Sequence, residues 1–244
     1  MKSFRLLALL TALLISLASP RAAQAATRIV LDGEFDDWGG KAHLDDPPGD
    51  ARRGDYDLVR LYWANNPDQA RLYFMVERLE HHKNDHKPVL YVMFIDTDND
   101  GRFNGPADAR VDVRYAPKSL GLVTVMVFRG PFPVAGYGGL WGETSDEGGT
   151  RCEWPVEFSD IDIEPGQVIR MVLFATDNPP NRPSIGAYEN LASSGKADRL
   201  PDSGDIQWAP VPTAPSWFHL VPLAMCVLAA GRFYSWRKRT SYLS

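Results

Sequence analysis

Between Arg28 and Trp208 the apolar residues recur mainly at every second position, in short runs separated by clusters of Gly, Pro, Asn and Asp. A period of two is typical of strands with one buried face, whereas a helix repeats about every 3.6 residues. The pattern therefore predicts an all-β domain. The expected strands are 28–31, 57–64, 71–78, 89–95, 110–115, 122–128, 151–156, 168–176 and 206–209.

Two of these segments indicate how the strands are arranged. Residues 110–115 alternate cleanly between apolar and polar, which favours one face on the core and one in water. Residues 89–95 are apolar on both faces and predict a central strand. Nine such strands favour an antiparallel β-sandwich of jelly-roll or immunoglobulin-like topology. Residues 130–149 and 177–205 lack a strand pattern and are predicted as long loops.

The two ends of the chain differ from this domain, which we place at residues 26–209. Residues 1–25 combine Lys2 and Arg5, an apolar run and a small-x-small ending, and predict a secretory signal peptide. Residues 210–216 predict a Pro-rich spacer. Residues 217–236 are mostly apolar and precede a basic tail, 237–244, so they predict one C-terminal transmembrane helix with the domain outside the cytoplasm. A processed sorting segment, or a buried C-terminal helix, are the alternatives. The expected location is the cell envelope.

Charge narrows the possible partners. Setting aside the seven basic residues of the two ends leaves 19 Lys and Arg against 31 Asp and Glu, a net charge of about −12 for the outer domain. Such a surface disfavours nucleic acid and suits cations. Because only Cys152 lies in this domain, an intradomain disulfide is excluded.

The segment Phe94 to Gly101 places three carboxylates at alternate positions directly after the apolar run 89–95. Hard cations take oxygen ligands, and the D-x-D-x-D-G spacing resembles the first half of a calcium-binding loop. Ala107 stands where a closing Glu is usual, so we expect the next residue to serve. The predicted calcium ligands are Asp96, Asp98, Asp100 and Asp108. An acidic hairpin turn without metal is the alternative.

Other chemistry is weakly indicated. His81, His82 and His86 form a cluster with Asp85 that has the ligand types for a transition metal, but it lies between two expected strands and is more typical of a solvated loop. No acid/base pair, G-x-S-x-G or H-E-x-x-H motif is present in the sequence. We therefore predict a non-catalytic protein.

The order of several short motifs resembles that of family 9-like carbohydrate-binding modules and related DOMON-type sandwiches. The chain opens its first expected strand into Asp32-Gly33 and Trp38, as that family does with a D-G-x-x-D-x-W turn. Three further pairs of segments are similar to the later strands of that family. They are 57–63 with 71–74, 94–101 with 107–108, and 153–156 with 166–174. Pro155 stands one position away from the place where that family has the proline of this late strand motif. The resemblance covers nearly all of residues 28–208 and implies a β-sandwich fold.

This resemblance implies a carbohydrate ligand, and sugar recognition needs aromatic faces beside polar side chains. The candidate glycan-binding residues are Trp63, Asn65, Tyr137, Trp141, Tyr188 and Asn190. Sandwiches of this type also include electron-transfer domains that hold a b-type haem partly by Met, so the resemblance leaves a haem-binding electron-transfer domain as the alternative, for which Met75 and Met93 are available. A structural module that contacts another envelope protein is the third alternative.

Overall fold

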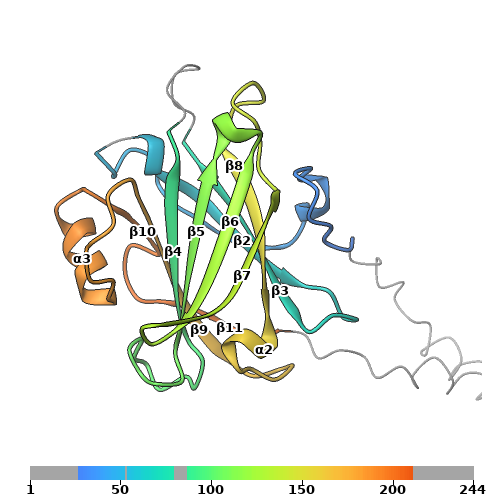
Figure 1. Ribbon diagram of the computed structural model, residues 1–244, viewed down its shortest axis with the longest axis vertical. Helices are drawn as coiled ribbons and strands as arrows, with labels where there is room; N and C mark the ends of the chain where they lie inside the picture. The colour runs from blue at the N-terminus through green and yellow to red at the C-terminus, as the bar shows by residue number, and fades with distance from the viewer. Residues whose placement is uncertain (1–26, 53, 80–86, 211–244) are drawn as a thin grey trace, which may run out of the picture.

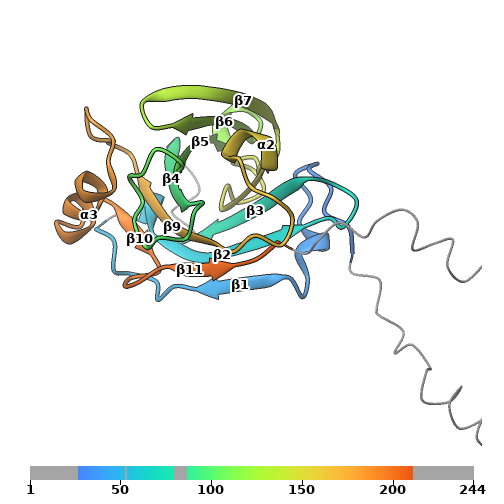
Figure 2. The same cartoon turned by 90° about the horizontal axis from the view of Figure 1, so that it is seen from below.

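A computed structural model describes residues 27–52, 54–79 and 87–210, and these form two antiparallel β-sheets packed face to face (Figures 1 and 2). The smaller sheet has the order β1-β2-β3-β8 and the larger one β10-β9-β4-β5-β6-β7, with β11 also pairing β9. The smaller sheet comprises β1 (Ala42–Asp45), β2 (Leu58–Asn65), β3 (Arg71–Arg78) and β8 (Arg151–Glu157). The larger comprises β4 (Val89–Asp96), β5 (Ala109–Ala116), β6 (Leu122–Arg129), β7 (Phe132–Leu140), β9 (Ile169–Thr176), β10 (Asp198–Leu200) and β11 (Ile206–Trp208).

The main core fills the space between the two sheets. Alternate residues of facing strands point into it, as the period of two requires. On β6 these are Val123, Val125 and Val127, all fully buried. In the smaller sheet Phe74 stacks on Trp154, with ring centroids 5.7 Å apart, and Tyr91 of the larger sheet packs against the same indole. The sandwich predicted from the sequence is therefore confirmed at the level of two packed antiparallel sheets.

The part of the chain that the structure describes also contains two short α-helices, α2 (Phe158–Ile161) and α3 (Ile185–Ser193). Ser184 caps the N-terminus of α3, because its Oγ accepts a hydrogen bond from the backbone N–H of Ala187. Its Tyr188 packs on Phe94 of β4 and Phe174 of β9, on the face of the sheet turned away from the core. This cover explains why residues 89–95 are apolar on both faces.

Eight of the nine expected strands are present within about a residue or two of the predicted bounds. Residues 28–31 are not a strand, although Ile29 is buried and bonds to Asn66 through its backbone. The two segments predicted as long loops are partly regular, because 130–149 contains β7 and 177–205 contains α3 and β10. β1 was not predicted.

The expected signal peptide, transmembrane segment and basic tail, and the histidine cluster at 81–86, lie outside the described residues. So does most of the expected spacer, of which only Pro210 is described. Among the helices of the described part, none has the length and apolar character needed to cross a membrane. The described cysteine, Cys152, is buried and free.

The turn that opens the domain is attached to β8 by one buried carboxylate. Glu153 Oε1 accepts hydrogen bonds from the backbone N–H groups of Asp32 and Gly33, both 3.0 Å long. Its Oε2 accepts a 2.9 Å hydrogen bond from the indole Nε1–H of Trp38, at the end of the 3-10 helix η1 (Asp36–Trp38). Burial, opposed by these hydrogen bonds, raises the pKa of Glu153 to about 7. Three donors from the opening turn and η1 thus converge on a group that lies 115 to 121 positions away in sequence.

Candidate metal-binding loop

The loop predicted to bind calcium leaves the larger sheet where β4 ends. Asp96 is the last residue of β4 and is fully buried. Its Oδ1 accepts from the backbone N–H of Asp100 (3.2 Å) and its Oδ2 from that of Gly101 (2.8 Å). Asn99 and Gly101 have positive φ angles of 58° and 85°, which turn the chain back over the Asp96 carboxylate. The local sequence therefore folds the loop around its first aspartate.

The turn brings three of the four predicted ligands together. One carboxylate oxygen from each of Asp96, Asp98 and Asp100 lies within 4.8 Å of the others. Asp108 is outside this group, and its Oδ2 accepts a hydrogen bond from the Gly105 N–H (2.5 Å). Its Oδ1 is buried without a hydrogen-bond partner. Burial raises the pKa of the Asp108 carboxyl, and the charges of Asp96 and Asp98 add to that rise. Asp108 thus lies near the group without belonging to it.

An arginine partly balances the charge of this loop. The Nε of Arg170 is 3.8 Å from Asp96 Oδ2 and donates a 2.7 Å hydrogen bond to Asn99 Oδ1. A side chain from β9 therefore holds the Asn99 side chain in place. Asp98 and Asp100 are exposed, so water molecules can complete the coordination of a hard cation. All the candidate ligands are oxygens, which suits calcium or magnesium better than a transition metal.

The six candidate glycan-binding residues are not brought together. Trp63, Tyr137 and Trp141 are partly buried and pack against the main core, and Tyr137 points inward beside Val125 of β6. Tyr188 is only 1% exposed and belongs to the cluster under α3, so its ring is not available to stack on a sugar. Asn190 is exposed on the same helix, at the β10 end of the larger sheet, whereas β7 forms the opposite edge (Figure 1). Asn65 ends β2 in the other sheet.

The two methionines considered for haem are also separated. Met93 is fully buried in the main core between the sheets. Met75 packs with Ile29 and Trp38 on the opposite face of the smaller sheet. Within the described residues, each methionine is thus enclosed by its own packed cluster.

A second group of carboxylates escaped the sequence analysis. Its members come from the β1–β2 connection and from the segment at β10. They are Asp46, Asp50, Asp57, Asp198 and Asp202. No local motif marks them, because residues from two ends of the domain meet only in the folded chain.

Comparison of the chain with protein-family models, with curated proteins and with solved structures found no match.

Proposed function

We propose that this chain is a non-catalytic binding module whose β-sandwich, of the jelly-roll or immunoglobulin-like kind, carries calcium in the loop after β4. The observation that supports this function is the convergence of the Asp96, Asp98 and Asp100 carboxylates at the end of a buried central strand. We further propose, from the motif resemblance and the ends of the sequence, that the module is exported, held at the cell envelope and directed to a polysaccharide or glycan.

Calcium should stabilise the folded chain, because a ligand that binds only the native state raises the free energy of unfolding. We expect the full chain to melt several degrees lower after chelation. Asp98→Ala should bind one calcium equivalent fewer than the wild type, since it removes an exposed ligand without disturbing the Asp96 hydrogen bonds. Asp146→Ala, an exposed aspartate in the turn before β8, is the matched control and should retain all bound calcium. An identical melting curve with and without chelator would exclude a metal here.

Carbohydrate binding is tested by a panel of polysaccharides presented to the full chain. We expect at least one to bind, and Trp141→Ala to weaken that binding by about tenfold, the loss expected for one aromatic contact of about 1.4 kcal/mol. Because Trp141 also packs on the core, the melting temperature of the Trp141→Ala variant must be measured in parallel. Wild-type chain that binds no polysaccharide would remove the carbohydrate part of the proposal.

One observation favours the alternative of a module that contacts another envelope protein. The outer face of β6 and β7 exposes apolar side chains on the edge of the larger sheet, among them Met126, Val134 and Leu140. Phe132, at the start of β7, is 71% exposed. Several exposed apolar side chains beside an edge strand of a sheet are typical of protein contact sites.

A further inference from the structure

The second carboxylate group lies where the β1–β2 connection meets β10 and the turn that follows it. Asp46 and Asp50 come from the connection, and Asp202 comes from the turn. One oxygen from each of these three lies within 4.8 Å of the others, and the same holds for Asp50, Asp57 and Asp198. Asp50 is common to both sets. Five carboxylates from distant parts of the chain therefore face one small space.

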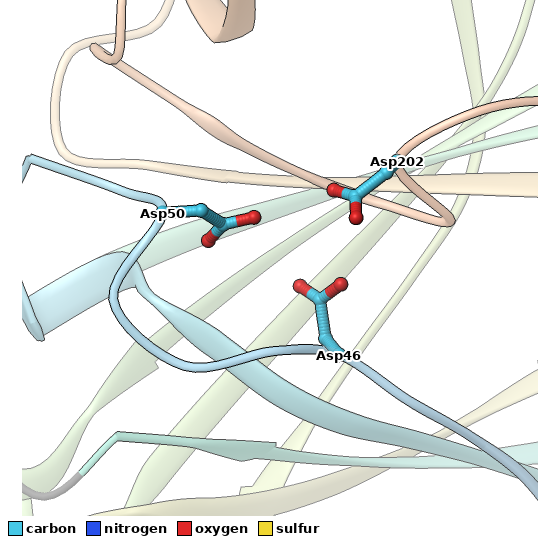
Figure 3. A group of neighbouring side chains, drawn as sticks. All are labelled: Asp46, Asp50 and Asp202. Carbon is cyan, nitrogen blue, oxygen red and sulfur yellow. The ribbon is translucent and has the colours of Figure 1, made fainter.

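Asp46 is the member of this group whose surroundings favour a bound cation. The residue is only 5% exposed, and its Oδ2 is buried with no hydrogen-bond partner. Figure 3 shows its carboxylate directed at those of Asp50 and Asp202. A buried carboxylate oxygen without a donor costs free energy, and aiming it at two further carboxylates adds repulsion. A cation between the three groups relieves both costs.

The described residues supply little positive charge to this space. Within the described residues, no Lys or Arg forms an ion pair with any of the five carboxylates. Arg199 lines the adjacent open cavity of about 550 Å³, but its guanidinium donates to the carbonyl oxygens of Pro201 and Gly204. Glu189 lines the same cavity and adds a further carboxylate. Burial, followed by the charges of the neighbouring aspartates, raises the pKa of Asp46 to about 8.

The remaining two carboxylates fix the geometry. Asp57 Oδ2 accepts from the Gly49 N–H (2.8 Å), which holds the turn that carries Asp50. Asp198 Oδ2 accepts from the Leu58 N–H (2.5 Å), a bond between residues 140 positions apart that joins β10 to β2. The other oxygen of Asp57, Oδ1, is buried and has no hydrogen-bond partner. The site is thus preorganised by the contacts that hold the two sheets together.

We propose that Asp46, Asp50 and Asp202 bind one calcium ion, independently of the loop after β4. The protein ligands are carboxylates alone. Such a set suits a hard cation such as Ca²⁺ better than it suits Zn²⁺ or Cu²⁺. Asp50 and Asp202 line the open cavity, so water molecules complete an irregular shell of the kind that calcium accepts and magnesium does not. The bound ion links the β1–β2 connection to the turn after β10 and so fastens one edge of the sandwich.

Calcium binding to the purified full chain tests this site, with Asp98→Ala as the background that silences the loop. By calorimetry and direct metal analysis, at calcium concentrations up to about 10 mM to cover the weak affinities of extracellular sites, we expect two ions in the wild type and one in Asp98→Ala. Adding either Asp50→Asn or Asp202→Asn should remove the remaining ion. Both residues are exposed, so these variants should fold.

Asp46→Asn provides a second measurement. It removes a buried carboxylate, so the calcium-free protein should melt no lower than the wild type, while calcium added in the Asp98→Ala background should no longer raise the melting temperature. A purely structural aspartate would instead lower the melting temperature in both conditions. Asp146→Asn, exposed and distant in sequence, should change neither.

The calcium measurements can exclude either proposed site without excluding the other. If Asp98→Ala binds no calcium, or if adding Asp50→Asn leaves its remaining ion in place, the site proposed in this section is excluded. If the wild type binds a single ion that Asp50→Asn removes and Asp98→Ala does not, this site stands and the loop after β4 is excluded.

Discussion

Replacing Glu153 with alanine should lower the free energy of unfolding by about 3–5 kcal/mol, the usual cost of removing one partner from a buried, charged hydrogen-bond group. Glu153 is fully buried, and its loss strands the N–H groups of Asp32 and Gly33 and the indole N–H of Trp38. The truncated side chain also leaves a cavity beside that indole. Urea denaturation followed by tryptophan fluorescence measures the change.

Glu153→Gln is the matched control, because glutamine keeps the size and one accepting oxygen. Glu153→Gln should lower the free energy of unfolding by less than the alanine variant does. The glutamine fills the same space, and its NH₂ group opposes a donor at only one of the two carboxylate oxygen positions. The pH profile separates the roles. Because burial raises the folded-state pKa of Glu153 to about 7, its contribution is complete below pH ~4.5 and is lost as the pH rises toward 7. The wild type should therefore lose up to ~3 kcal/mol across that window relative to Glu153→Gln. Equal unfolding free energies for the alanine and glutamine variants, or parallel pH profiles, would contradict this role.

The strands were predictable wherever local pattern and tertiary environment agree. On β5 and β6 buried and exposed side chains alternate along the strand, and the sequence alternates with them. On β4 the continuous apolar run predicted a central strand correctly, because β5 and β9 flank it and α3 covers its outer face. α3 itself was missed, since its nine residues carry Gly186 and two small residues at its end, Ala192 and Ser193, and show only a weak apolar stripe.

The candidate sites divide in the same way. Asp96, Asp98 and Asp100 were identifiable because their spacing within one turn decides their convergence. The group around Asp50 was not, since it depends on how the β1–β2 connection packs against β10. Tyr188 was misjudged for a related reason. An aromatic residue in a polar, Pro-rich segment suggests an exposed ring, whereas the fold uses it to cover β4 and β9.

β7 shows why glycine-rich sequence was mistaken for loop. The glycines of residues 136–142 serve close approach rather than flexibility. A Cβ on Gly139 would overlap the indole ring of Trp141, and one on Gly142 would overlap the ring of Tyr115. Past the end of β7, the chain pairs with β8 through the Glu153 N–H and the Trp141 carbonyl (2.9 Å), which joins the two sheets along this edge. Glycine is required where these rings lie directly against the backbone.

Gly121 lies against the backbone of Gly142, and replacing Gly121 is the change for which we expect the second large effect on stability. It has a φ of 69°, and an added Cβ would overlap the carbonyl oxygen of Gly142. We expect Gly121→Ala to lose about 4 kcal/mol or more of unfolding free energy, because a backbone atom cannot swing aside as a side chain can. If little soluble protein is recovered, the yield relative to wild type reports the same defect. The change should appear as a shifted denaturation midpoint with an unchanged slope.

Gly130 at the other end of β6 separates strain from overlap. Its φ is also positive, at 54°, but an added Cβ would meet nothing within 4 Å. Gly130→Ala should therefore cost only the roughly 1–2 kcal/mol of a left-handed alanine. A difference of at least ~2 kcal/mol between the two variants follows from the overlap alone. If both lose the same free energy, the backbone crossing at Gly142 has room to relax, and the closure of the sandwich edge does not depend on glycine.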